Sequence, residues 1–151
     1  MTVRRIQLPD EMNAADTLPG ADYVCVFELP IRESSTRSPQ DWARAVFEGA
    51  PPLLRWFIRT GWRFPLRFDL APPGAPNHVL GGRIVLDERT TFVMELCSPL
   101  MTARDIVLIE QARIVLATLV RYRRPIARPL WSAAAVIHHR IMPYLLTRAA
   151  G

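Results

Sequence analysis

The chain has 151 residues, of which half are hydrophobic and 22% are charged, and its formal net charge is +5. This composition excludes an intrinsically disordered chain and predicts one globular domain with a core of its own. No uninterrupted apolar run is longer than that of residues 133–137, whereas a bilayer crossing needs about 20 apolar residues. No apolar run follows the basic residues at the start, so we expect a cytoplasmic protein without a secretory signal.

The positive charge is concentrated in two stretches that contain no acidic residue. Every basic residue is arginine, and residues 55–67 hold four of them and residues 119–151 hold six. Such a surface favours anionic partners, although arginine stems can also simply cover apolar surface with their heads in water. No motif for sequence-specific nucleic-acid recognition is present. The residues of the candidate anion-binding surface are Arg55, Arg59, Arg63, Arg121, Arg123 and Arg124.

The first elements in chain order are an arm and a strand. Residues 1–20 predict an irregular N-terminal arm, which leaves residues 21–151 as a single domain. The stretch ADYVCVFELP then alternates between two faces, with Tyr23 and Cys25 on one of them. This alternation predicts a strand that ends at Pro30.

Two short helices are expected next. Ser38, Pro39 and Asp41 have the spacing of a capping box with proline at the first helical position, so a helix begins there and ends near Gly49. The stretch APPLLRWFIRTG predicts a second helix that ends at Gly61.

Four runs rich in β-branched residues follow: HVLGGRIVLD, TTFVMELCS, TARDIVLIE and ARIVLATLVRY. They predict consecutive antiparallel strands. Residues 103–122 lack a clear turn signal, so one long helix is the alternative for that stretch. A last helix is expected from about Arg128 to Ala149, with a bend at Pro143.

These elements predict an α+β domain in which a curved antiparallel sheet wraps around the long C-terminal helix, with the two short helices at one end. A straight helix cannot fill a concave sheet completely. A cavity between the helix and the sheet is therefore expected.

The order of these elements resembles the helix-grip fold of the START-like and polyketide-cyclase-like (SRPBCC) superfamily. Within it, the chain is similar to a family of bacterial proteins of unassigned function. The stretches that carry the resemblance are DYVCVFELP, WARAVFEGAPPLLR, VLGGRIV, CSPLMTARDIVL, VLATLVRYRRPIARPLW and HHRIMPYLL, which together span most of residues 22–146. The resemblance implies a fold and a cavity but no particular reaction, because such folds carry many unrelated activities.

The chain departs from the family pattern at three positions. The histidine that aligns with the family is His138, but Val136 stands where the family has proline and His139 where it has arginine. Gly82 stands where the family has an aromatic residue, a loss that would widen a pocket or relax the strand.

The two adjacent histidines fall on different faces of the last helix. On a helical wheel His138 lies with the apolar residues, whereas His139 lies with the polar ones and is expected to face water. Three roles for His138 remain open: a core residue that orients the helix, a hydrogen-bonding group for a ligand, or a general acid or base. Its candidate hydrogen-bonding partners on the sheet are Tyr23, Glu95 and Thr118.

Cys25 and Cys97 are the only cysteines, and each is expected to be a small buried hydrophobe. They form no cluster with histidine along the sequence, so neither a metal site nor a cofactor is predicted.

The sequence thus favours a domain that binds a small apolar or amphipathic molecule between its long helix and its sheet. His138 would supply a polar contact, and the apolar walls would include Trp131, Met142, Phe92 and Met94. One alternative is a cyclase- or hydratase-type enzyme that uses the same cavity. The other is an interaction module whose arginines and aromatic residues Trp56, Trp62, Phe64 and Phe68 bind a membrane or a protein.

Overall fold

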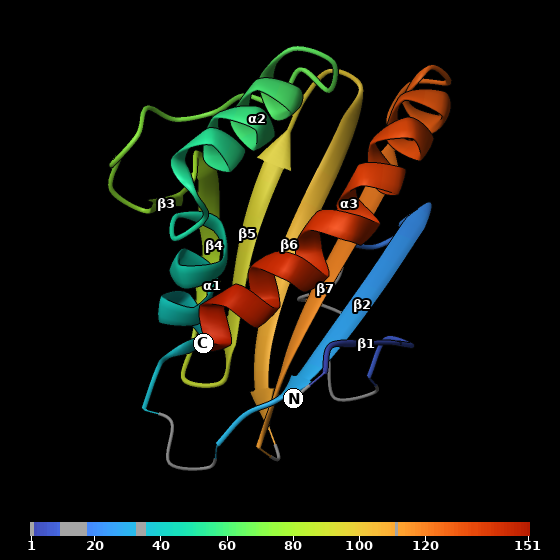
Figure 1. Cartoon of the computed structure of the whole chain (residues 1–151). Helices are drawn as coiled ribbons and strands as arrows, with labels where there is room; N and C mark the ends of the chain where they lie inside the picture. The colour runs from blue at the N-terminus through green and yellow to red at the C-terminus, as the bar shows by residue number, and fades with distance from the viewer. Residues whose placement is uncertain (1, 10–17, 33–35, 111) are drawn as a thin grey trace.

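The computed structural model describes residues 2–9, 18–32, 36–110 and 112–151. It contains the strands β1 (Arg4–Ile6), β2 (Tyr23–Pro30), β3 (His78–Val79), β4 (Gly82–Asp87), β5 (Thr91–Cys97), β6 (Met101–Glu110) and β7 (Arg113–Tyr122), and the helices α1 (Pro39–Phe47), α2 (Pro52–Arg63) and α3 (Ala127–Ala150). The strands form one antiparallel sheet in the order β1-β2-β7-β6-β5-β4-β3. Figure 1 shows the sheet curving behind the three helices, with α3 lying across it. The predicted α+β class and curved antiparallel sheet are confirmed.

The N-terminal arm is not wholly irregular. β1 lies within it and pairs antiparallel with β2, with Arg5 opposite Phe27. Ile6, Leu8 and Leu18 pack against the face of the sheet that carries no helix. The arm therefore closes a second, smaller core; the rest of the predicted arm, residues 1 and 10–17, lies outside the described residues.

α1 begins where its sequence predicts. The Ser38 hydroxyl accepts a hydrogen bond from the backbone N–H of Asp41 at 3.1 Å, and the Asp41 carboxylate accepts one from the Ser38 N–H at 3.4 Å. α2, by contrast, does not end at Gly61 but continues to Arg63. The extra residues place Trp62 against the main hydrophobic core, and this packing outweighs the low helix propensity of glycine.

The stretch 103–122 forms two strands rather than the alternative long helix, since β6 and β7 pair along their whole length. The stretch 78–87, predicted as one strand, is instead the hairpin of β3 and β4. Leu80 and Gly81 have φ angles of 49° and 92°, as a two-residue type I′ turn requires. Directly after this turn, Met94 and Leu96 fill the space that a side chain at Gly82 would occupy.

α3 runs through Pro143, and the Thr147 hydroxyl donates to the Pro143 carbonyl at 2.8 Å. Its axis changes direction along its length, so that the helix follows the curve of the sheet (Figure 1). This agrees with the predicted bend. The buried side chains of α3 are Ala127, Trp131, Ala135, Met142, Leu145, Leu146 and Ala149.

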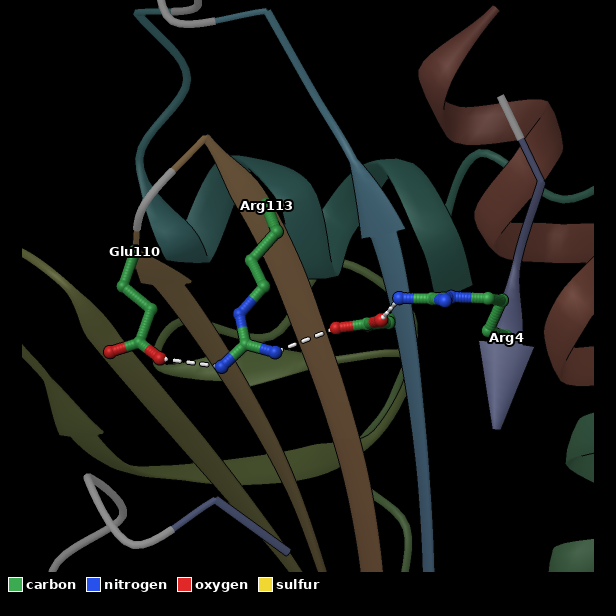
Figure 2. A network of polar contacts seen from close by, with 4 residues as sticks. Arg4, Glu110 and Arg113 are labelled. Carbon is green, nitrogen blue, oxygen red and sulfur yellow. Dashed lines mark hydrogen bonds and ion pairs between the residues drawn. The ribbon is translucent and has the colours of Figure 1, made fainter. Parts of the chain in front are cut away.

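Glu28 of β2 joins three strands on the face of the sheet opposite the helices. Its buried carboxylate accepts hydrogen bonds from Arg4 of β1 and from Arg113 of β7, and Arg113 also binds Glu110 at 2.8 Å (Figure 2). The hydrogen bond from Arg113, followed by that from Arg4, holds the pKa of Glu28 below its ordinary value of 4.5.

We expect Glu28→Gln to lower the free energy of unfolding by about 1–3 kcal/mol at pH 7, because the arginines lose a charged, hydrogen-bonded partner. A carboxyl group with a lowered pKa stabilises the fold above its unfolded-state pKa, and this contribution is lost as pH falls through the folded-state value. In urea denaturation, the difference in free energy of unfolding between Glu28→Gln and the wild type should therefore become smaller below pH 4.5. Glu88→Gln, at an exposed position, is the control, and an equal loss at pH 7 and pH 3 would contradict the charge-based explanation.

Candidate functional site

A cavity of about 650 Å³ lies between α2, α3 and the helix-bearing face of the sheet. The side chains of α2, α3 and the concave sheet do not fill the space between these elements. Its apolar walls come from α2 and the segment after it (Trp56, Phe57, Ile58, Trp62, Pro65, Leu66, Phe68), from α3 (Leu130, Trp131, Ala133, Ala134, Ile137, Ile141, Met142) and from Phe47, Leu96 and Ala103.

Three polar side chains from three elements meet in the wall of this cavity. Asp105 of β6 and Thr118 of β7 are directly opposite each other in the sheet. The Thr118 hydroxyl donates to the Asp105 carboxylate at 2.6 Å, and the His138 Nε2 atom lies 3.2 Å from the same hydroxyl oxygen. Because the threonine proton is used by Asp105, its oxygen accepts from Nε2–H, which assigns the proton of the neutral imidazole to Nε2. The Nδ1 atom of His138 is buried and has no hydrogen-bonding partner among the described residues.

Burial shifts the pKa values of both ionisable members of this group in opposite directions. Burial raises the pKa of Asp105 from 3.8 to about 6, and the hydrogen bond from Thr118 offsets only part of that rise. Burial also lowers the pKa of His138 from 6.5 to about 4, with a smaller repulsive contribution from His139. At neutral pH the wall therefore holds a neutral imidazole and a carboxyl group that titrates just below neutrality.

Four of the predicted site residues line the cavity: His138, Trp131, Met142 and Thr118. Phe92 and Met94 face the same side of the sheet, but they are fully buried in the main core rather than in the cavity wall.

Of the proposed partners of His138, Tyr23 packs edge-on against its ring, with centroids 6.4 Å apart, but its hydroxyl lies beside His139 instead. Glu95 lies elsewhere. Strand alternation places Glu95 on the opposite face from Met94, where it forms ion pairs with Arg104 at 2.8 Å and Arg83 at 3.5 Å. Of the three candidate partners, Thr118 is the one that contacts His138 through a hydrogen bond.

Asp105 is a site residue that was not predicted from the sequence. The sequence does contain a pattern that could have identified it, because β6 places the side chains of Ala103, Asp105 and Val107 on one face of the sheet. A single carboxylate on an otherwise apolar, inward-facing row is unusual, since buried charges need compensation.

His139, predicted to face water, is only partly exposed because it contacts Tyr23. Its Nε2 atom lies 2.6 Å from the Tyr23 hydroxyl oxygen, and the two rings stack with centroids 6.0 Å apart. The edge of the curved sheet reaches around the side of α3, a contact that a helical wheel does not represent.

Cys25, His138 and His139 come together beside the cavity, and one ligand atom from each lies within 4.8 Å of those from the other two. These are the residues of the described chain that could hold a metal ion. The sequence predicts no metal site because Cys25 is distant from the histidines along the chain, and the pairing of β2 with β7 brings it beside them. Cys97, predicted to be buried, is exposed on the other face of the sheet, where its thiol donates to Glu95 at 3.3 Å.

The predicted arginine surface is divided between α2 and the end of β7, and several of its members bind backbone carbonyls. Arg55 donates to Glu48 and Arg59 to Ala71, while Arg121 and Arg123 donate to Pro19 and Ser98; Arg63 and Arg124 are exposed. Several large apolar side chains on or beside α2 are also exposed, and they are Leu53, Trp56, Phe57 and Phe64. Trp62 and Phe68 instead pack inward.

Within the described part of the chain, none of the helices combines the length and the apolar character that a membrane crossing requires. No protein-family model matches the chain, and no curated protein matches it. The functional conclusion therefore rests on the geometry of the cavity and its polar residues.

Proposed function

We propose that the protein binds a small apolar or amphipathic molecule in the cavity between α3 and the sheet, on a helix-grip fold of the START-like type. The observation that carries this proposal is the cavity itself. Its volume of about 650 Å³ lies inside the range of about 300–1,000 Å³ that is usual for small-molecule sites. Its walls are apolar apart from Thr60 and the compact group of Asp105, Thr118 and His138, and a few polar groups in an apolar wall are common in such sites.

The polar group suggests how a ligand would be oriented. Asp105, Thr118 and His138 come from two neighbouring strands and the facing helix, so they form one polar region in an apolar wall. An apolar body would contact Trp131 and Met142, and a polar end of the ligand would lie against the Asp105–Thr118–His138 group. Ligands of this shape bury most of their surface and keep one hydrogen-bonding end.

The order of elements supports the same proposal. A curved antiparallel sheet that ends in a long C-terminal helix, with two helices after an early strand, is the arrangement that the START-like resemblance implies.

Native mass spectrometry of the purified protein, followed by organic extraction, tests this function. The expected result is a discrete additional mass that disappears on extraction and returns when the extracted molecule is added. A protein that carries no additional mass and binds no member of a panel of fatty acids and aromatic compounds would overturn the proposal.

Asp105 favours an acid–base enzyme as a second candidate function. A carboxyl group with a pKa of about 6 beside an apolar cavity has the properties of a general acid or base near neutral pH. Under this alternative, the variant Asp105→Asn would retain the extracted ligand but lose its conversion, as followed by mass spectrometry over time. Retention of conversion in that variant would exclude Asp105 as the acid or base.

A further inference from the structure

Cys25, His138 and His139 offer a thiol and two imidazoles from two elements that are packed against each other. One ligand atom from each residue lies within 4.8 Å of the other two. Ligands around a bound Zn²⁺ lie about 2.0–2.3 Å from the metal, so small movements of these side chains would bring all three into coordination.

Both histidines already have the hydrogen bonds that usually hold metal-binding imidazoles in place. The Nε2 atom of His138 is bound to Thr118, which is bound in turn to the Asp105 carboxylate. The Nε2 atom of His139 lies beside the Tyr23 hydroxyl. A histidine that binds a metal through one ring nitrogen typically uses the other nitrogen in this way.

The Nδ1 atom of His138 provides an independent indication of a metal site. It is buried and has no partner among the described residues, and an unpaired buried acceptor destabilises a fold by about 1–3 kcal/mol. A metal ion would use its lone pair without requiring any further donor from the protein.

The chemistry of the ligands indicates which class of ion would bind. One sulfur and two imidazole nitrogens favour ions of the Zn²⁺ type over Mg²⁺ or Ca²⁺, which prefer oxygen. The charges also balance, since a Zn²⁺ ion would be neutralised by the Cys25 thiolate and the nearby Asp105 carboxylate. Arg5, which makes a small contribution to the lowered pKa of His138, has an exposed side chain.

We propose that Cys25 and one ring nitrogen each of His138 and His139 form a binding site for Zn²⁺ or a similar thiol-preferring divalent ion. The three protein ligands leave a fourth position, which a water molecule or an added ligand would fill. This site lies beside the cavity and goes beyond the proposed ligand-binding function, because it does not require the cavity to hold any organic molecule.

The test is a titration of reduced, metal-free protein, without a histidine tag, with Co²⁺ and then with Zn²⁺ as competitor. We expect a thiolate-to-cobalt absorption band that saturates at one ion per chain and disappears when Zn²⁺ is added. Cys25→Ser should abolish the band and weaken Zn²⁺ binding by about 100-fold, and His139→Ala should weaken it by at least about 10-fold. Cys97→Ser and His78→Ala are matched controls that should leave the cobalt absorption band and the Zn²⁺ affinity unchanged.

Unchanged Zn²⁺ affinity in folded Cys25→Ser, or a cobalt complex without a thiolate band, would overturn the site. If Cys25→Ser does not fold, His139→Ala serves as the test, because His139 is only partly buried. Retained Zn²⁺ affinity in His139→Ala overturns the proposal, and lost Zn²⁺ affinity supports it. Binding of the extracted organic ligand is measured in the same variants, so failure of the metal site is distinguished from failure of the cavity.

Discussion

Asp105→Asn is expected to increase the free energy of unfolding at pH 7 by up to about 3 kcal/mol. The pKa of Asp105 is raised from 3.8 to about 6 by burial, and a difference of one pKa unit between the unfolded and folded states corresponds to about 1.4 kcal/mol. Because the folded-state pKa is the higher one, the folded protein binds the proton more tightly, and stability is lost as pH rises from about 4 to 6. Asparagine removes the charge but keeps an oxygen that can accept the hydrogen bond from Thr118.

Chemical denaturation at pH 4 and pH 7.5 measures this effect. The stability of Asp105→Asn should exceed that of the wild type at pH 7.5, and the difference should shrink towards pH 4, where the wild-type carboxyl group is largely protonated in the folded state. Asp69→Asn, at an exposed position, is the control and should change little. If Asp105→Asn raises the free energy of unfolding equally at both pH values, or lowers it at pH 7.5, burial does not govern the ionisation of Asp105.

A buried carboxylate that costs the fold this much stability is a residue of functional interest. Strongly shifted pKa values cluster at binding and catalytic sites, and residues kept for function frequently reduce stability. Asp105 contributes to the cavity wall, to the orientation of His138 and to the charge balance of the proposed metal site. All three roles require a buried Asp105 side chain, and the stability measurement tests that burial.

Local patterns predicted much of the fold because each one reflects a local physical constraint. The runs rich in β-branched residues predicted β5 and β7 as strands, and the structure buries Phe92 and Met94 of β5 in the main core. The capping box at Ser38 predicted the start of α1, because its hydrogen bonds involve residues only three positions apart.

The features that were missed are a turn with an unusual backbone conformation and contacts between distant residues. The turn at Leu80 requires a positive φ from a residue type that rarely adopts one, so propensity predicts a continuous strand there. The short strand β1 exists because β2 provides an edge with which it can pair. Likewise, the meeting of Cys25 with His138 depends on the register of β2 against β7 and on the position of α3 over both, neither of which sequence periodicity reveals.

A cavity between the long helix and the sheet was predicted from the sequence, but only some of the residues that line it were. α3 contributes Trp131, His138 and Met142, as expected. α2 contributes Trp56 and Phe57, neither of which was predicted from the sequence to line the cavity. A helical wheel shows that a helix is amphipathic, but it does not show that its apolar face borders an open space instead of a filled core.

Ala134→Trp is expected to weaken binding of the extracted ligand by about 100-fold or more. Ala134 lies on α3, is partly buried and lines the cavity, so an indole at this position would occupy space that the ligand needs. The folded state should be affected much less, because the ring enters an existing cavity and does not have to displace a packed core.

Isothermal titration calorimetry with the extracted ligand, together with thermal unfolding of each variant, tests this prediction. Ser132→Trp adds the same ring two residues earlier at an exposed position of α3 and should leave affinity unchanged. If Ala134→Trp folds normally and binds as tightly as the wild type, the ligand does not occupy the space between α2, α3 and the sheet. If Ala134→Trp alone loses binding, the apolar cavity is the site, and His138 and Asp105 are then the groups to vary against the polar end of the ligand.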